Sequence, residues 1–197
     1  LGGLDSGTVM QLALLNAAFE TGLKSPLDEA ILAAGNIDLT AWRKIDEVPF
    51  DFERRRVSIL LEGEGRRRIV LKGAPEDVLG LAARYEQQGS PPRPLDAAAR
   101  KTAEATFNAF GAQGYRVLGV AWRDVEADRQ HANVADEKDL IFAGFLAFLD
   151  PPKAGAGEAL AALANLGVAV KVVTGDNEQV TRHVCNELGL NVAGTLT

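Results

Sequence analysis

The sequence has 197 residues, of which 47 % are hydrophobic, a proportion that supports a packed core and argues against a disordered chain. Its formal net charge of -6 argues against a general nucleic-acid binder, which needs a surplus of Lys and Arg to meet the phosphates. The single cysteine, Cys185, excludes a disulfide framework and a cysteine metal site, which fits a reducing cytoplasm. His131 and His183 have no ligand partner at metal-binding spacing, so we predict no metal site in this chain. No apolar run reaches the roughly 20 residues that span a bilayer, so we expect the chain to be soluble as given.

Two helices are predicted at the start of the chain. Residues 8–19 combine helix-forming residues with apolar residues at helical spacing, and Ser6 is a suitable N-cap. The second helix begins at Ser25, which is followed by proline and two acidic residues, and it ends at Gly35. Asp28 therefore has a structural role in the first turn of this helix, whatever else it does.

A β-rich region follows and completes residues 1–149. The pattern predicts antiparallel strands and flanking helices, which together form an α+β domain. The expected strands are 42–48, 55–62, 67–72, 115–122 and 140–149, and the expected helices are 75–85 and 95–110. The second and third strands form a hairpin through the Gly-Glu-Gly sequence at 63–65.

A second region begins at residues 150–153, whose Asp-Pro-Pro-Lys sequence cannot continue a central strand and is interpreted as a hinge. A helix at 154–166, a buried strand at 168–173 and a helix that ends at 188 are predicted beyond it. This order is half of a parallel, Rossmann-like α/β unit. We therefore predict two parts, residues 1–149 and a hinge with a partial domain at 150–197, and expect the fragment to end inside a larger domain.

The sequence Lys-Gly-Ala-Pro-Glu at 72–76 is a candidate ligand site. Lys72 lies at the end of a strand, and Gly73 has no Cβ to hold a phosphate or a purine away. A surface lysine before a turn is the alternative. Phe50, just before the basic cluster at 54–56, favours the ligand because a phenylalanine ring can stack on adenine. Phe52 is interpreted as a core residue.

The Thr-Gly-Asp sequence formed by Thr174, Gly175 and Asp176 is a second candidate site. It follows a predicted strand, where open α/β sheets bind ligands, and its hydroxyl and amides suit a phosphoryl group. A plain strand-to-helix turn with an acidic or amide N-cap explains the same residues equally well. The sequence has no Walker phosphate loop, no dinucleotide fingerprint and no serine-hydrolase elbow.

With these residues collected, the chain resembles the nucleotide-binding (N) domain of P-type ATPases followed by part of their phosphorylation (P) domain, which is of the haloacid dehalogenase type. The resemblance covers nearly the whole chain. It rests on Phe50 before the Arg-rich strand and on the motifs at 72–76, 150–153 and 173–177, which occur in the order of the family. Residues 21–31 and 44–56 are most similar to the bacterial magnesium-importing type.

The resemblance implies a set of ATP-binding residues. Phe50 would stack on adenine, Lys72 and Gly73 would line the adenine pocket, and Asp28 would accept a hydrogen bond from the purine amino group. Arg55 and Arg116 would contact the phosphates or the ribose, and Leu118 would complete an apolar wall for the base. Asp28 departs from the Glu that is common in the family, and its shorter side chain is expected to reach the base through water.

The resemblance also implies what this chain does not contain. The Asp-Lys-Thr-Gly-Thr segment that carries the phosphorylated aspartate is missing, as is the later magnesium-binding motif. We therefore expect this fragment to bind ATP without hydrolysing it. Thr174, Gly175 and Asp176 would help receive the phosphoryl group with Mg²⁺. The implied partners are ATP, the rest of the P domain, the actuator domain and the transmembrane helices of the same polypeptide, a cation pump of the inner or plasma membrane.

Two alternatives belong to other classes of protein. A phosphatase of the haloacid dehalogenase type with a cap domain shares the Thr-Gly-Asp half-domain, but it needs a nucleophilic Asp-x-Asp that this sequence lacks. A regulatory or protein-binding module without catalysis is the other alternative. It predicts no response of Phe50, Lys72 or Arg116 to nucleotide.

Overall fold

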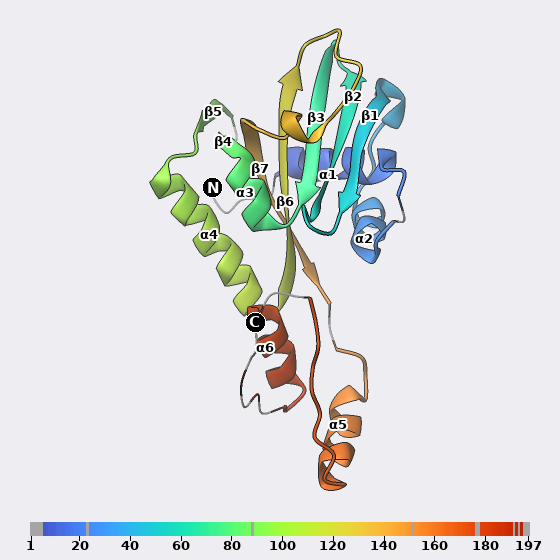
Figure 1. Ribbon diagram of the computed structural model, residues 1–197, viewed down its shortest axis with the longest axis vertical. Helices are drawn as coiled ribbons and strands as arrows, with labels where there is room; N and C mark the ends of the chain where they lie inside the picture. The colour runs from blue at the N-terminus through green and yellow to red at the C-terminus, as the bar shows by residue number, and fades with distance from the viewer. Residues whose placement is uncertain are drawn as a thin grey trace. The chain divides into compact units, whose positions relative to one another are not determined.

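The computed structural model describes residues 6–22, 24–87, 89–150, 152–175, 178–190, 192 and 194. The chain forms two compact units. The first unit comprises Leu1–Glu104 and Leu118–Leu146, and the second comprises Ala105–Val117 and Ala147–Thr197. A sheet with helices on both of its faces makes up most of the first unit (Figure 1).

The described helices and strands follow one another in chain order as shown in Figure 1. The helices are α1 (Gly7–Phe19), α2 (Pro26–Ala34), α3 (Pro75–Leu81), α4 (Ala97–Ala112), α5 (Ala156–Asn165) and α6 (Glu178–Glu187), with the 3-10 turns η1 (Leu39–Ala41) and η2 (Val134–Asp136). The strands are β1 (Trp42–Asp51), β2 (Arg56–Gly63), β3 (Arg66–Gly73), β4 (Ala82–Gln87), β5 (Ser90–Pro94), β6 (Tyr115–Val125) and β7 (Leu140–Leu149).

The strands among the described residues form one sheet in the order β1-β2-β3-β6-β7-β4-β5. The pairs β1–β2, β2–β3 and β3–β6 are antiparallel, as predicted from the sequence. The pair β4–β5 is also antiparallel, but neither of its strands was predicted. The β4–β7 pair is parallel, which the sequence did not predict. The sheet is therefore mixed, and the α+β class with flanking helices is confirmed.

Helix α1 packs on β2 and β3 and lies behind these strands in Figure 1. Its N-cap is Ser6, as predicted, whose Oγ accepts a hydrogen bond from Val9 N at 3.4 Å. Near its other end, the fully buried Asn16 donates from Nδ2 to the carbonyl oxygens of Val70 at 2.9 Å and Val57 at 3.4 Å. One amide thus holds the helix against two neighbouring strands.

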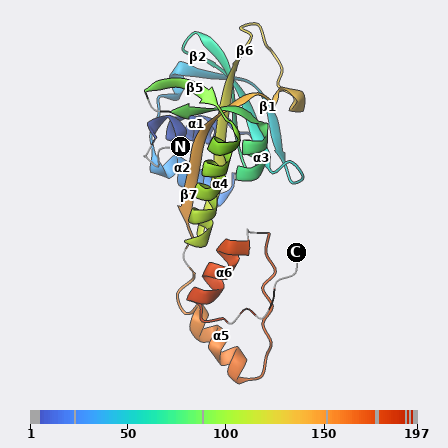
Figure 2. The same ribbon diagram turned by 90° about the vertical axis from the view of Figure 1, so that its left-hand side faces the viewer.

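The opposite face of the sheet is covered by α3 and by the first turns of α4 (Figures 1 and 2). The buried side chains of this core come from strands and helices far apart in the sequence. They are Leu71, Val78, Leu79, Ala82, Leu95, Ala103, Ala121, Leu140 and Phe142. Burial of these apolar side chains, at about 25 cal/mol per Å² removed from water, is the main stabilising contribution here.

The predicted helix at 75–85 is too long. Helix α3 ends at Leu81, and the chain enters β4 directly at Ala82. The strand β5 contains three prolines, which suit an edge strand because proline donates no ladder hydrogen bond. The apolar residues in 75–85 fit a helical period, so the pattern alone did not reveal where the strand begins.

The buried strand predicted at 168–173 is not formed in the second unit. Residues 168–174 are in no helix or strand, and Val168, Val170, Val172 and Val173 are exposed. A parallel strand needs hydrogen-bonded neighbours, and the described residues supply none for this segment. The two helices predicted around it are present as α5 and α6. The domain boundary at 149/150 stays a prediction.

Removal of the Asn16 amide should loosen α1 from the sheet. We expect Asn16→Ala to lower the free energy of unfolding by about 1–3 kcal/mol, because two buried carbonyl oxygens lose their donor. Urea unfolding followed by circular dichroism measures this loss. Gln11→Ala is the matched control, since Gln11 is exposed on the same helix, and an equal loss in both variants would contradict the assignment.

Candidate functional site

Lys72 is the central charged group of the first unit. It lies on β3, where its backbone pairs with Val57 of β2 and Val120 of β6, and it is only 5 % exposed. Its Nζ contacts Asp28 Oδ1 directly and lies 3.3 Å from Glu20 Oε2. These three side chains form a buried cluster, which we call the lysine cluster (Lys72, Asp28 and Glu20).

Asp28 has two roles that use different oxygens of its carboxylate. Its Oδ2 accepts hydrogen bonds from Ser25 N at 3.0 Å and Ser25 Oγ at 2.7 Å, which completes the capping box at the start of α2. Its Oδ1 contacts Lys72. The predicted capping role is therefore confirmed, and it coexists with the ion pair because the first turn of α2 directs Asp28 toward β3.

Burial and the Lys72 ammonium act on the two carboxylates differently. Burial raises the pKa of Asp28, but the hydrogen bond and the charge of Lys72 outweigh burial and lower that pKa below its usual value. Burial dominates at Glu20 and raises its pKa, although Lys72 acts in the opposite direction. Asp28 is thus the firmly ionised partner of Lys72, and Glu20 is the more easily protonated one.

Phe50 lies on β1, in an irregular stretch of the ladder. Val48 pairs with Ser58 and Asp51 pairs with Arg56, so Pro49 and Phe50 together lie opposite Val57. Because Val57 also pairs with Lys72, the bulge and Lys72 occupy the same row across three strands. The Phe50 ring is half exposed and meets the ring of Phe52 edge to face at 5.3 Å.

Phe52 is 89 % exposed, so its interpretation as a core residue is wrong. The residues 52–55 form the turn between β1 and β2, where a side chain points away from the core. The end of β1 and the turn thus present two exposed aromatic rings, Phe50 and Phe52, next to the basic cluster. Only Phe50 lies on the row that leads to Lys72.

Arg55 and Gly73 lie together where β2 begins and β3 ends. Arg55 has a left-handed backbone with φ of 50°, and its Nε donates to Asp77 Oδ2 at 3.0 Å. A Cβ on Gly73 would lie 2.6 Å from Arg55 O. Gly73 is therefore required by the close approach of β2, which explains this glycine without a ligand.

The other expected residues do not all join this group. Leu118 is half buried on β6 of the first unit. Arg116 belongs to the second unit, where its Nη1 lies 3.5 Å from Asp150 Oδ2. Thr174 and Gly175 are exposed in the second unit, and Asp176 lies outside the described residues.

Three acidic residues that pair with these basic side chains were not predicted from the sequence. Glu20 follows α1 directly and contacts Lys72, and Asp77 on α3 pairs with Arg55. Glu137, in the loop between β6 and β7, pairs with Arg54 and Arg56. A buried lysine requires a counter-charge, but the sequence does not say which of the 27 acidic residues supplies it.

The chain matches a family model described as "P-type ATPase, cytoplasmic domain N" over residues 5–155. The chain belongs to this family. It is 39 % identical over 97 % of its length to "Magnesium-transporting ATPase, P-type 1" of Escherichia coli K12, and 38 % identical over 100 % to the protein of that name in Salmonella typhimurium 14028s. It is also 31 % identical, over 75 % of its length, to "Calcium-transporting ATPase 3, endoplasmic reticulum-type" of Arabidopsis thaliana.

The chain spans 22 % of the length of the magnesium-transporting relatives and 15 % of the Arabidopsis protein. None of the helices in the described part of the chain is long and apolar enough to cross a bilayer. The predicted family and the similarity to magnesium-transporting ATPases are confirmed. The residues of the site itself remain predictions.

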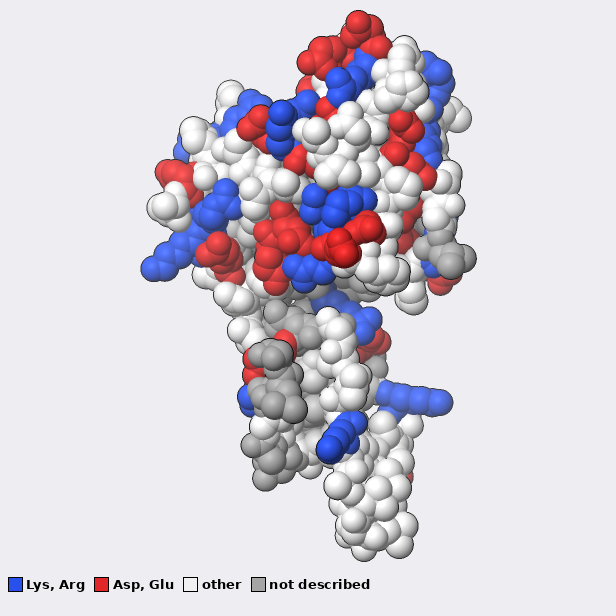
Figure 3. Space-filling model, viewed as in Figure 1, with Lys and Arg blue, Asp and Glu red and all other residues white. Residues whose placement is uncertain are grey.

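Two further surfaces of domain N differ from the lysine cluster. A groove of about 500 Å³ lies between α1, η1 and β1, with Met10, Leu14, Ile37 and Trp42 among its lining residues, and none of the expected site residues contributes to it. On the face seen in Figure 3, basic and acidic side chains alternate over the described part of the first unit. This face does not carry the continuous basic surface that nucleic-acid binding requires.

The lysine cluster makes stability depend on pH in a defined direction. The lowered pKa of Asp28 contributes stability that is fully present above its unfolded value of about 3.9 and is lost as pH falls through the folded value. We expect the free energy of unfolding to fall more steeply on acidification in the wild type than in Asp28→Asn. Urea unfolding at several values between about pH 3 and pH 7 measures both curves.

Glu20→Gln is the contrasting variant. The raised pKa of Glu20 contributes stability that is fully present below its unfolded value and is lost as pH rises through the folded value. Glu20→Gln should therefore gain stability relative to wild type as pH rises toward neutral. Parallel curves for all three proteins would contradict the roles assigned to the two carboxylates.

Proposed function

We propose that the chain is the ATP-binding domain of a P-type cation pump and that the base of ATP binds at the row formed by Phe50, Val57 and Lys72. The observation that carries the proposal is the combination of a half-exposed ring with a buried ammonium on one row of the sheet. A face of apolar and aromatic side chains with one charged group at its end suits an adenine ring.

Each residue of the row contributes a different interaction. The ring of Phe50 stacks on the base, and stacking of this kind contributes about 1–3 kcal/mol. The Lys72 ammonium has three N–H donors, and among the described residues Asp28 and Glu20 accept from two of them. The third donor is directed to a ring nitrogen of the base, and Asp28 accepts from the amino group, through water where its shorter side chain falls short.

The phosphates extend from the row toward Arg55, whose guanidinium is 53 % exposed and is held by Asp77 at the turn. Leu118 completes the apolar wall, and Arg116 contacts phosphate or ribose. Mg²⁺ bound to the phosphates neutralises their charge for transfer. The side chains of domain N contribute positioning, which brings the γ-phosphate to an aspartate outside this chain.

The parent protein is, in this proposal, a membrane pump whose cytoplasmic part includes this chain. The transported ion is Mg²⁺, a proposal that rests on the similarity to the magnesium-transporting ATPases of Escherichia coli and Salmonella typhimurium. Residues 150–197 act as the hinge and a part of the P domain, where Thr174, Gly175 and Asp176 support, together with Mg²⁺, the transfer of the phosphoryl group to the aspartate outside this chain. The partners are the remaining P domain, the actuator domain and the transmembrane helices of one polypeptide.

The proposal is tested by calorimetric titration of the chain with ATP. We expect a dissociation constant of about 0.1–1 mM, because the pocket holds mainly one end of the nucleotide. Phe50→Ala should weaken binding about tenfold, since it removes the stacked ring. Phe52→Ala is the matched control, because this ring lies in the same turn but outside the row, and it should bind ATP as the wild type does.

Two results would contradict the proposed function. One is the absence of ATP binding at several times the expected dissociation constant. The other is an equal affinity in wild type and Phe50→Ala, which would indicate that nucleotide binds elsewhere or that the domain is a regulatory module.

A further inference from the structure

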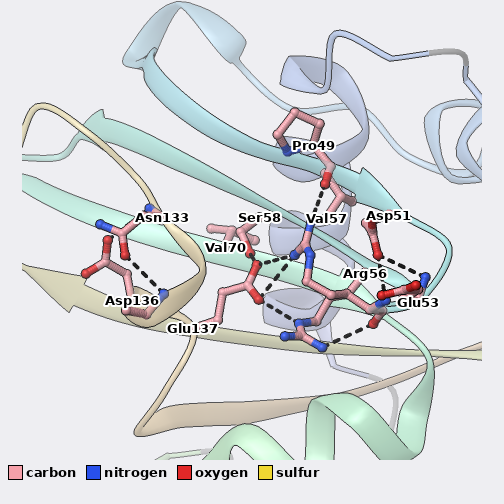
Figure 4. Close-up of polar contacts among 12 residues, drawn as sticks. Pro49, Asp51, Glu53, Arg56, Val57, Ser58, Val70, Asn133, Asp136 and Glu137 are labelled. Atoms are coloured by element: carbon pink, nitrogen blue, oxygen red, sulfur yellow. Dashed lines mark hydrogen bonds and ion pairs between the residues drawn. The ribbon is translucent and has the colours of Figure 1, made fainter.

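Glu137 is a buried acid in the loop between β6 and β7, and its carboxylate gathers three side chains (Figure 4). Its Oε1 accepts from Ser58 Oγ at 2.6 Å and from Arg54 Nη1 at 3.1 Å. Its Oε2 accepts from Arg56 Nε at 2.6 Å. The Glu137 side chain is 1 % exposed, so these charge-assisted hydrogen bonds are shielded from water and strong.

The partners of Glu137 surround the turn that connects β1 to β2. Arg54 donates from Nη2 to the carbonyl oxygen of Pro49 at 2.6 Å, and Arg56 donates from Nη1 to the carbonyl oxygen of Arg54 at 3.1 Å. Asp51 Oδ1 accepts from the backbone N–H groups of Glu53 and Arg54, both at 2.9 Å. The turn is therefore held both by its own polar groups and by a carboxylate from a distant loop (Figure 4).

The residues fixed by Glu137 directly flank two residues that the proposed function uses, Phe50 at the end of β1 and Arg55 in the turn. Pro49, whose carbonyl is bound by Arg54, precedes Phe50. Arg54 and Arg56 lie on either side of Arg55, which has the left-handed backbone. A shift of either guanidinium therefore changes the direction of the neighbouring ligand-binding side chain.

Glu137 acts from the face of the sheet opposite to Lys72. Val57 and Lys72 are pair partners, and paired residues share a face. Arg56 and Ser58 flank Val57 on β2, so their side chains point to the other face, where Glu137 binds them. Glu137 thus contacts the turn without entering the proposed base site.

The loop of Glu137 is held independently of this carboxylate. Asp136 Oδ2 accepts from Asn133 N at 3.0 Å, and its Oδ1 contacts the Arg129 guanidinium. Ala132 N donates to Asp46 Oδ2 at 3.0 Å, which ties the loop to β1. Attachment of the loop therefore does not explain why a further acid is buried against Arg54 and Arg56.

We propose that Glu137 is a positioning residue of the nucleotide site, which sets Phe50 and Arg55 through Arg54 and Arg56. This inference rests on the proposed function, because it assigns the purpose of the geometry to ATP binding. It predicts a reciprocal link in which the loop between β6 and β7 and the base site stabilise each other.

The experiment compares the full chain as wild type, Glu137→Gln and Asp136→Asn. Amide NMR spectra without nucleotide report the turn from Asp51 to Arg56, and calorimetric titration with ATP reports affinity. We expect Glu137→Gln to shift the turn resonances and to raise the dissociation constant for ATP about tenfold, since the site loses its preorganised geometry. Asp136→Asn, which disturbs the same loop without contacting the turn, should leave that constant within about twofold.

Arg54→Gln is the second variant and applies if Glu137→Gln does not fold. It removes the link between Glu137 and Pro49 but leaves the contacts of Glu137 with Arg56 and Ser58. We expect the same turn resonances to shift and the dissociation constant to rise about threefold, also at high salt, where direct attraction between the partly exposed Arg54 and ATP is screened. A rise that disappears at high salt would overturn the positioning role.

The outcomes separate the positioning role from the function on which it rests. ATP binding that Phe50→Ala weakens and Glu137→Gln leaves intact would overturn the positioning role alone. The same holds if Asp136→Asn weakens binding as much as Glu137→Gln. Failure of the wild-type chain to bind ATP would overturn the proposed function and the positioning role with it.

Discussion

The arrangement of the first unit depends on one buried cation, Lys72. An ammonium group removed from water is costly unless it is paired, and here two carboxylates from separate segments meet it. Glu20 comes from the end of α1, and Asp28 comes from the first turn of α2. The cation on β3 therefore links the end of α1 and the beginning of α2 to the same strand. Phe50 on β1 and Lys72 on β3 lie on either side of Val57 in one row of the sheet.

Much of this unit could be predicted from the sequence, because local rules decide it. The Ser-Pro start of α2, the Gly-Glu-Gly hairpin and the Lys-Gly strand end each require few neighbours, and each was predicted with errors of a residue or so. The β4–β5 hairpin was missed, because its first strand continues a helix without a break. Glu20 and Glu137 were missed as partners, because a long-range ion pair leaves no periodic trace in a sequence.

In the second unit the sequence predicted the helices but not the conformation of the segment between them. Its helices are formed as predicted, but the valine-rich segment between them stays exposed and outside any ladder. An alternating apolar pattern is compatible with a strand that pairs with neighbouring strands on both sides. Strand formation is cooperative between segments, so the pattern of one segment does not decide it alone. This chain covers only about a fifth of the magnesium-transporting relatives, so most of their length lies outside this sequence.

The position of β7 in the sheet has a consequence for how the chain is made. In sequence β7 is the last of the described strands, but in the sheet it lies between β6 and β4, and its residues 140–142 pair with residues 82–85. During synthesis the hairpin of β4 and β5, which ends at Pro94, must therefore wait without this neighbour until residues 140–142 have emerged. Such late, long-range closure slows folding and exposes unpaired strand edges to other chains. Of the described strands, the one that joins β6 to β4 is thus the last to be synthesised.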